Sequence, residues 1–248
     1  MFRRVATRLR AFVAPPAAAE PVPSLHATVA YHCAHIVLHG APSPQTVPSR
    51  YSTELSRALQ LKTTPWRGLV NFASDSVSNP SSEDRCALTV FSALNGSLHV
   101  PQLTMDNLDE VAEQLHRHAT VPTALKVDEK LYIYVCTHTA RDCRCGETGG
   151  AVYRAMRAEL DARQTANVVL GEVTHVGQHQ FAANVLVFPH GEWFGRVTVD
   201  AVPSLLDTLL ASPRRPLAPS EPALYPSLWR GRMGLNKEQQ TQLAPPSA

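Results

Sequence analysis

The sequence predicts an α/β protein built from two domains of similar size and the same element order. The chain has 248 residues, of which 44% are hydrophobic. This suits two compact domains of about 100 residues each better than one small module. Short apolar runs, turn signals and amphipathic stretches follow one another in the same order in residues 24–121 and 122–212. We therefore expect the order β-α-β-β-β-α twice in tandem.

The N-terminal domain, residues 24–121, begins with a short apolar strand, and a proline-rich loop then leads to a helix. An Asn95-Gly96 pair joins two later strands into a hairpin, because this dipeptide readily adopts the positive φ angles of a tight turn. The expected elements are strand His35–His39, helix Arg50–Leu61, strands Gly68–Ala73, Cys86–Ser92 and Ser97–Leu103, and helix Thr104–His118.

The second domain, residues 122–212, repeats this order, with a His190-Gly191 turn and with Asp200 as the N-cap of its last helix. The expected elements are strand Leu131–Val135, helix Thr148–Asp161, strands Asn167–Val173, Ala183–Phe188 and Trp193–Val199, and helix Val202–Leu210. A parallel βαβ start followed by an antiparallel hairpin and a closing helix is the thioredoxin-like order. We interpret the chain as two thioredoxin-like βαβββα domains in tandem. Duplication is the hypothesis, and a chance likeness of two α/β domains is the alternative.

The two ends of the chain differ from these domains. Residues 1–23 carry four arginines before the first acidic residue, Glu20, and an apolar stripe at helical spacing. This composition is typical of a mitochondrial presequence, and a basic tail is the alternative. Residues 213–248 begin as a proline-rich linker and then contain Leu228-Trp-Arg-Gly-Arg-Met-Gly-Leu235. We expect that segment to dock on the second domain, with a partner-binding peptide as the alternative.

Charge and cysteine content narrow the functional classes. The formal net charge of +2 gives no support for a nucleic-acid binder. No apolar run reaches the roughly 18 residues of a membrane span. Five cysteines are present, and three of them fall within ten residues, 136–145. The odd number and the clustering indicate a metal or redox site in a reducing compartment, not a disulfide framework.

Two cysteines and two histidines form the candidate site. Cys136 follows the first expected strand of the second domain, and Cys145 precedes its helix. His175 and His179 follow the next strand, nearly forty residues after Cys136. Because the carboxyl ends of neighbouring parallel strands meet at one sheet edge, these four side chains can converge. Thiolates and imidazoles are soft or borderline ligands that suit a metal, so the sequence predicts a metal site.

Three segments resemble the sucrase/ferredoxin-like family, which includes a fungal mitochondrial branch. They read VCTHTARDCRCG, HVGQH and WRGRMGL in this chain. The resemblance implies a thioredoxin-like ferredoxin in the C-terminal domain, whose [2Fe-2S] cluster is held by Cys136, Cys145, His175 and His179. The family's second segment often reads H-x-G-G-H, whereas Gln178 replaces the second glycine here. Cys143 adds a thiol where the family has no ligand.

The residues support this ligand set and leave two other chemistries open. Two cysteines on one iron and two histidines on the other form the ligand set of Rieske centres, and neutral imidazole raises the reduction potential relative to thiolate. Cys2His2 also binds zinc, although zinc fingers usually have two to four residues between the cysteines. Thiol chemistry at Cys143 and Cys145 is a third option, since Arg141 and Arg144 would lower their pKa values.

Further residues are weaker candidates. His32, His35 and His39 lie near Cys33 and form a second possible metal group, although strand positions explain them better. His138 is a spare ligand or, more simply, a hydrogen-bond donor. No nucleophile triad or phosphate-binding loop is present in the sequence, so we expect a non-catalytic electron-transfer protein. Its expected partner is an unidentified redox protein, its expected location is the mitochondrial matrix, and zinc-stabilised interaction or thiol quality control is the alternative function.

Overall fold

The computed structural model describes residues 23–77, 82, 84–124 and 127–245. The predicted presequence, residues 1–23, lies outside these residues except for Pro23. The strands are β1 Ala34–Leu38, β2 Gly68–Ser74, β3 Cys86–Ser92, β4 Gly96–Leu103, β5 Leu131–Cys136, β6 Val168–Val173, β7 Val185–Phe188, β8 Glu192–Phe194 and β9 Trp229–Arg232. The α-helices are α1 Glu54–Thr63, α2 Leu108–Thr120, α3 Gly150–Ala162, α4 Val202–Ala211 and α5 Lys237–Leu243. A π-helix spans Cys145–Gly149, and short 3₁₀ turns span Thr64–Trp66, His179–Phe181, Val199–Ala201 and Pro226–Leu228.

Both halves of the chain have the expected β-α-β-β-β-α order. In each half the first two strands are parallel, the third is antiparallel to the first, and the fourth is antiparallel to the third. The strands join into one sheet with the order β4-β3-β1-β2-β6-β5-β7-β8-β9. The two halves meet where β2 and β6 pair antiparallel, through Ala73 with Val173 and Ser74 with Glu172. The structure is thus a mixed α/β fold, and descent from a duplication stays a hypothesis.

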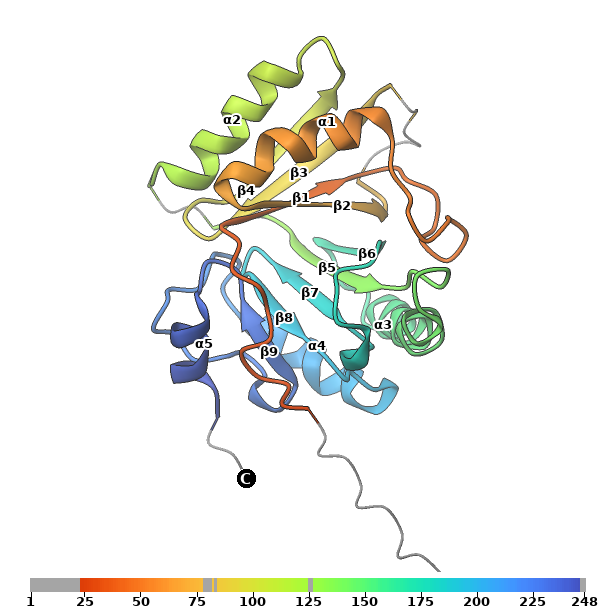
Figure 1. The fold of residues 1–248 in the computed structure, drawn as a ribbon. Coiled ribbons are helices and arrows are strands. Elements are labelled where there is room, and N and C mark those ends of the chain that lie inside the picture. The colour runs from red at the N-terminus through yellow and green to blue at the C-terminus, as the bar shows by residue number, and fades with distance from the viewer. Residues whose placement is uncertain (1–22, 78–81, 83, 125–126, 246–248) are drawn as a thin grey trace, which may run out of the picture.

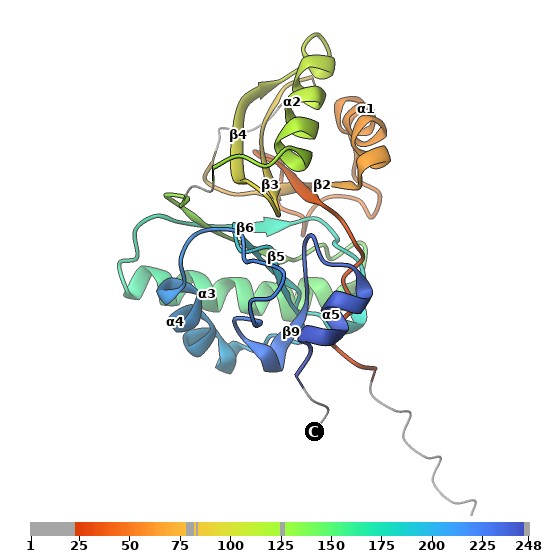
Figure 2. The ribbon, with the colours of Figure 1, turned by 90° about the vertical axis from the view of Figure 1, so that its left-hand side faces the viewer.

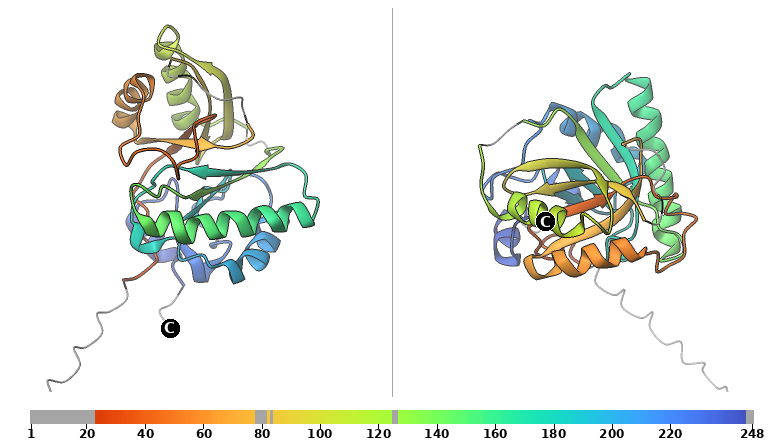
Figure 3. Two further views of the ribbon diagram at one scale, coloured as in Figure 1. Left: turned by 90° about the vertical axis from the view of Figure 1, so that its right-hand side faces the viewer. Right: turned by 90° about the horizontal axis from the view of Figure 1, so that it is seen from above.

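The two halves of the sheet face each other, and the helices cover their outer sides. Figures 1 and 2 show α1 and α2 beyond the β1–β4 half and α3 and α4 beyond the β5–β8 half. An apolar layer between the halves joins residues of both, including Phe91 of β3 and Phe188 of β7. These two rings stack with centroids 4.3 Å apart. Figure 3 shows the same arrangement from the opposite side and from above. Each half also has its own core between strands and helices.

This layering explains why β5 is buried at every position. Successive residues of a strand point to opposite faces of the sheet. In β5, Leu131, Ile133 and Val135 pack into the core beneath α3 and α4. Tyr132, Tyr134 and Cys136 point the other way, into the layer shared with the first half. Cys136 therefore faces the N-terminal domain and not the helices of its own domain.

Two helices and one strand begin or end at other residues than the sequence predicts. The helix expected from Arg50 begins at Glu54, because Thr53 and Ser56 form a reciprocal capping box ahead of it. The helix expected from Thr104 begins at Leu108, because Thr104 instead donates its backbone N–H to the Asn107 side chain. The strand expected over Trp193–Val199 ends at Phe194. Beyond it the backbone bonds to other segments, such as Arg196 N–H to the Phe181 carbonyl.

The C-terminal tail adds a strand and a helix that the sequence analysis did not predict. β9 pairs antiparallel with β8, and Trp229 is fully buried in the second core. Arg232 is also buried, with its Nε 2.5 Å from Glu192 Oε1. Its remaining nitrogens donate to the carbonyls of Ala218, Glu221 and Pro222, so it holds the preceding proline-rich segment against the domain. None of the helices in the described ranges is long and apolar enough to cross a membrane.

The buried pair predicts a large stability loss for Arg232→Leu. Removing one partner leaves the Glu192 carboxylate buried without its counter-ion, at a cost of about 3–5 kcal/mol. Arg215→Leu is the matched control, because Arg215 also pairs with a glutamate, Glu221, but both side chains are about 30% exposed. That control should lose about 1 kcal/mol or less. Urea unfolding of both variants measures the difference, and equal losses would contradict the role given to Arg232.

Candidate metal centre

Strand pairing brings the candidate ligands together. Cys136 is the last residue of β5 and lies in register with Val173, the last residue of the parallel neighbour β6. Thr174 and His175 follow directly, so His175 emerges beside Cys136. Cys145 opens the π-helix that continues into α3, which returns the chain to the same edge. Pairing of β5 with β6 therefore achieves the convergence predicted from the two strand ends.

Three of the four expected ligands form a tight group. One ligand atom each from Cys136, Cys145 and His175 lies within 4.8 Å of the other two. Cys145 Sγ is 3.9 Å from His175 Nδ1. Both cysteines are fully buried, whereas His175 is partly exposed. Two soft ligands and an imidazole at this spacing match the donor set of a zinc or iron site.

The two thiols influence each other's protonation. A hydrogen bond from the Cys145 thiol holds the pKa of Cys136 well below its usual range, although burial opposes this shift. The same interaction, with burial, raises the pKa of Cys145. The pair therefore accommodates one negative charge easily and a second one only at high cost. A bound metal cation would remove that cost, because metal ligation favours the thiolate form of cysteine.

His179 lies beside this group but outside it. Its ring centroid is 6.1 Å from that of His175, with the ring planes 32° apart. Its Nδ1 lies 3.3 Å from Asp142 Oδ2, and its side chain is 47% exposed. A carboxylate on one ring nitrogen of a histidine is a common arrangement where the other nitrogen binds metal. The structure thus places all four residues at one edge and brings three of them into contact distance.

Asp142 is held firmly in the loop between the cysteines. Arg144 donates to it from its backbone N–H, Nε and one terminal nitrogen, at 2.9–3.0 Å. These bonds lower the pKa of Asp142 to about 2. Asp142 therefore stays ionised and keeps a negative charge near His179. Asp142 thus braces the loop between the cysteines, whereas Arg141 lines a neighbouring cavity.

His138 and Cys143 stand apart from the thiol group. His138 Nδ1 accepts from the His175 backbone N–H at 3.3 Å, and its Nε2 donates to the Pro48 carbonyl at 3.0 Å. Because both ring nitrogens are engaged, His138 supports the loop and is not a spare ligand. Cys143 is exposed on the loop surface, unlike its buried neighbour Cys145.

Glycines allow the loop to approach the ligand strand. A Cβ on Gly149 would lie 2.2 Å from the Cys136 carbonyl oxygen, a backbone atom that cannot move aside. A Cβ on Gly146 would lie 2.3 Å from Thr139 Oγ1. The π-helix therefore packs directly on the residue that carries the first thiol. A Cβ on Gly150 would meet no atom closer than the flexible end of the Arg154 side chain, at 3.3 Å, so the close approach requires glycine at Gly146 and Gly149.

Gln178 occupies a position where the backbone conformation favours glycine. It adopts left-handed backbone angles, φ 54° and ψ 60°, where glycine avoids the steric cost that other residues pay. Its side chain compensates: Nε2 donates to the Thr28 carbonyl at 2.8 Å, and Oε1 accepts from Arg230 at 3.0 Å. The replacement of glycine thus ties the histidine loop to both ends of the chain.

Arg230 is a functional candidate that the sequence analysis missed as an individual residue. It is buried, donates to Asn184 Oδ1 at 2.7 Å, and lies over the Phe181 ring at 4.9 Å. Burial lowers the pKa of Arg230 to about 10, while the nearby Cys136 acts in the opposite direction. A positive charge is thus fixed within electrostatic reach of the thiol group. The sequence segment WRGRMGL indicated a docking tail, but nothing in it showed which of its two arginines lies near the thiol group.

The N-terminal domain also supports the histidine loop. The Asn71 side-chain amide donates to Thr174 Oγ1 at 3.1 Å and to the His175 carbonyl at 3.3 Å. The Phe72 backbone N–H donates to Thr174 Oγ1 at 3.1 Å. Strand β2 of one domain therefore fixes the backbone of a candidate ligand in the other. Sequence spacing could not have shown this contact, because about a hundred residues separate its two sides.

The second metal group, His32, His35 and His39 with Cys33, does not form. Among the described residues, Cys136, Cys145 and His175 are the one group of this kind with converging ligand atoms. His32 and His35 instead contact Trp193 in the apolar layer between the domains. His39 bonds to Asp75 at 2.8 Å and to Thr89 at 2.7 Å. The Cys33 thiol donates to the Trp66 carbonyl.

Known proteins match this chain over different extents. It is 32% identical over 130 residues to Actin patches distal protein 1 of Saccharomyces cerevisiae, which covers 47% of this chain and 41% of that protein. It is 38% identical over 82 residues to Altered inheritance of mitochondria protein 32 of Meyerozyma guilliermondii, which covers 32% of this chain and 29% of that protein. The matches therefore span less than half the length of these relatives.

A solved structure is also similar in part. A thioredoxin-like [2Fe-2S] ferredoxin from Aquifex aeolicus aligns with 34% of this chain and 83% of its own, with 16% identity and a TM-score of 0.30. The Sucrase/ferredoxin-like family matches residues 25–231, which include both domains and the candidate metal centre. This match confirms the family expected from the three sequence segments. The chain therefore belongs to the Sucrase/ferredoxin-like family.

Proposed function

We propose that this protein is a ferredoxin that binds one [2Fe-2S] cluster through Cys136, Cys145, His175 and His179. The observation that carries the proposal is the buried thiol pair with His175 beside it, at the carboxyl ends of two parallel strands. Membership of the Sucrase/ferredoxin-like family supports it. Such a cluster accepts and releases single electrons, and the function is electron transfer or redox sensing with an unidentified partner protein.

Each residue around the centre has a separate task in this proposal. Cys136 and Cys145 supply thiolates in a buried pocket, and His175 and His179 supply neutral ligands toward the more exposed side. The Asp142 carboxylate, 3.3 Å from His179 Nδ1, would orient that ring. The buried positive charge of Arg230 stabilises additional negative charge at the centre. Fewer anionic ligands and a nearby cation both favour the reduced state.

We further propose that both halves are thioredoxin-like and arose by duplication, and that the protein works in mitochondria, within the matrix. The equal order of elements and strand pairings in the two halves supports the first part. The arginine-rich residues 1–23 support the second. The name of the relative Altered inheritance of mitochondria protein 32 also agrees with a mitochondrial role.

A zinc site is the second candidate, and one observation favours it. The ligand atoms of Cys136, Cys145 and His175 all lie within 4.8 Å, which suits a single ion, whereas His179 lies apart. In that case the protein would be a zinc-stabilised interaction or thiol quality-control protein, with the exposed Cys143 as its reactive thiol. Metal and sulfide content distinguish the two candidates.

The first prediction for the centre concerns its composition. Protein purified without oxygen should contain iron and acid-labile sulfide, each at about two per chain, because one [2Fe-2S] cluster holds two of each. It should also absorb visible light. About one zinc per chain with no sulfide would instead establish the zinc site and exclude the ferredoxin.

Cysteine variants test the ligand assignment. Cys136→Ser and Cys145→Ser should lose the cluster, because each removes a buried thiolate ligand. Cys143→Ser is the matched control, since it removes an exposed thiol from the same loop. It should keep full iron and sulfide content. Loss of visible absorbance in Cys143→Ser as well would show that the assignment is wrong.

The next prediction concerns the histidines. His175→Cys and His179→Cys should each keep a cluster, because thiolate is a competent iron ligand, and should lower the reduction potential by about 100 mV or more. They should also weaken its pH dependence, since each removes a titratable imidazole. Redox titration of both variants and the wild type from pH 6 to 10 provides the measurement. An unchanged potential in both variants would mean that neither histidine touches the cluster.

The predicted presequence can be tested by mitochondrial import. Changing Arg3, Arg4, Arg8 and Arg10 together to glutamate should abolish mitochondrial import of a fluorescent fusion, because import of a basic segment is driven by the negative interior potential. The same four changes to lysine keep the positive charge and should preserve import. A glutamate variant that still reaches mitochondria would show that residues 1–20 are not the signal.

A further inference from the structure

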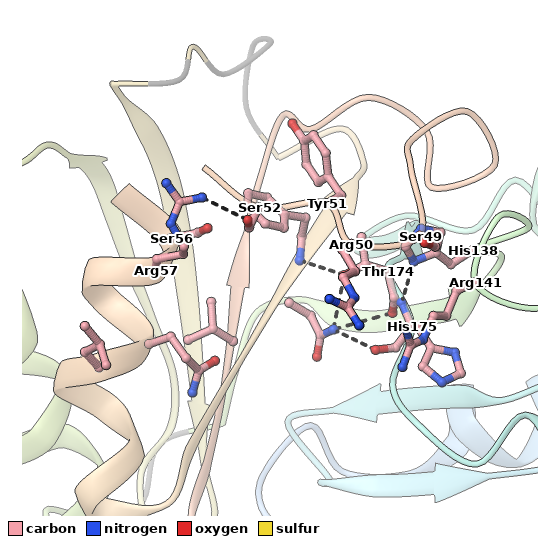
Figure 4. A pocket seen from close by; sticks show the side chains of 15 residues that line it. Ser49, Arg50, Tyr51, Ser52, Ser56, Arg57, His138, Arg141, Thr174 and His175 are labelled. Atoms are coloured by element: carbon pink, nitrogen blue, oxygen red, sulfur yellow. Dashed lines mark hydrogen bonds between the residues drawn. The ribbon is translucent and has the colours of Figure 1, made fainter. Parts of the chain in front are cut away.

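A cavity of about 670 Å³ opens directly beside the candidate metal centre. One wall comes from the N-terminal domain, through residues 49–52, α1 and β2. The other comes from the second domain, through His138, Arg141, Thr174 and His175. Figure 4 shows Arg57 and Ser52 at the α1 side and Arg141 and His175 at the opposite side. Its volume is in the range of small-molecule sites, which often lie between domains.

The charged residues that line this cavity are all positive. Arg50, Arg57 and Arg141 line it, and none of the described lining residues is an aspartate or glutamate. The guanidinium groups of Arg50 and Arg141 have no hydrogen-bond or ion-pair partner within the described part of the chain. Arg57 donates to Ser52 Oγ at 3.0 Å. Positive charge inside a concave wall concentrates the electrostatic potential, and arginine binds phosphate and carboxylate groups through paired hydrogen bonds.

The rest of the lining is suited to the body of a ligand. Tyr51 and Phe72 contact each other edge to face, with centroids 4.8 Å apart, and Val70 and Leu61 extend this apolar wall. Ser56 and Gln60 add a hydroxyl and an amide group to the lining. A bare inorganic ion would leave the apolar wall unused. The cavity is therefore complementary to an anionic head joined to an aromatic or apolar body.

We propose that this cavity binds a small organic anion, a phosphate or carboxylate with an aromatic or apolar body, in contact with His175. The binding itself depends only on the cavity, whereas its consequence for the metal centre rests on the proposed function. A bound anion places negative charge beside a ligand of the centre. It should therefore lower the reduction potential, so the protein would respond to the concentration of this anion.

Calorimetric titration of the purified protein with phenyl phosphate tests the binding. Wild-type protein should bind it more tightly than inorganic phosphate or phenol, because the cavity contacts both head and body, and added salt should weaken binding. The double variant Arg50→Gln/Arg141→Gln should bind at least tenfold more weakly. Lysine at both positions should recover part of the affinity, because it keeps the charge but not the paired bonds.

Arg117→Gln is the matched control, since Arg117 is an exposed arginine on α2 outside the cavity. It should bind like the wild type, and equal melting temperatures should show that all variants fold. Equal affinity in the double variant and in Arg117→Gln would overturn the proposal, as would absence of binding at millimolar phenyl phosphate.

Redox titration with and without phenyl phosphate separates this proposal from the function on which its consequence rests. The potential should shift downward in the wild type and not in the double variant. Protein that binds phenyl phosphate but carries no iron or sulfide would reject the ferredoxin and keep the anion site. Protein that carries a cluster but does not bind phenyl phosphate would keep the ferredoxin and reject the anion site. Binding of phenyl phosphate without a change in reduction potential would reject the effect of the anion on the metal centre.

Discussion

Two thiols buried next to each other impose the main physical constraint on this protein. Burial disfavours their charged form, and each thiolate disfavours the other, so only one negative charge is easily accommodated between Cys136 and Cys145. The surroundings reduce this cost in two ways. Arg230 fixes a positive charge nearby, and an interaction with the His175 side chain lowers the pKa of Cys136. A bound metal cation would complete this balance, since its positive charge favours both thiolates.

The N-terminal domain has no counterpart of this centre among its described residues, yet the centre depends on it. Asn71 and the Phe72 backbone hold Thr174 and His175, and Pro48 holds His138. Cys136 points into the apolar layer that the two domains share. The N-terminal domain therefore covers one face of strand β5 and holds the loop that carries His175 through hydrogen bonds. It also forms one wall of the arginine-lined cavity, so a molecule bound there would contact both domains.

The two ends of the described chain converge on the same loop. Gln178 accepts from Arg230 of the C-terminal strand and donates to Thr28 near the N-terminus. Arg232 anchors that strand through Glu192 and the carbonyls of the proline-rich segment. The tail is thus a structural part of the second domain. Its two arginines have different roles, because Arg232 anchors the tail and Arg230 places a buried positive charge near the thiol of Cys136.

The sequence by itself determined the order of elements and the four candidate ligands. These features follow from local signals in the sequence. The signals are the apolar runs, the Asn95-Gly96 turn and the positions of Cys136 and His175 at strand ends. Helix starts at Glu54 and Leu108 were missed, because side-chain caps shifted them by a few residues. Only the tertiary structure decided that His179 stands apart from the thiol group and that His138 is fully hydrogen-bonded. It also showed that Arg230 is buried near enough to Cys136 to interact with it electrostatically, and that three arginines line one cavity. Those facts depend on contacts between residues tens to hundreds of positions apart, which are set by packing and not by local sequence.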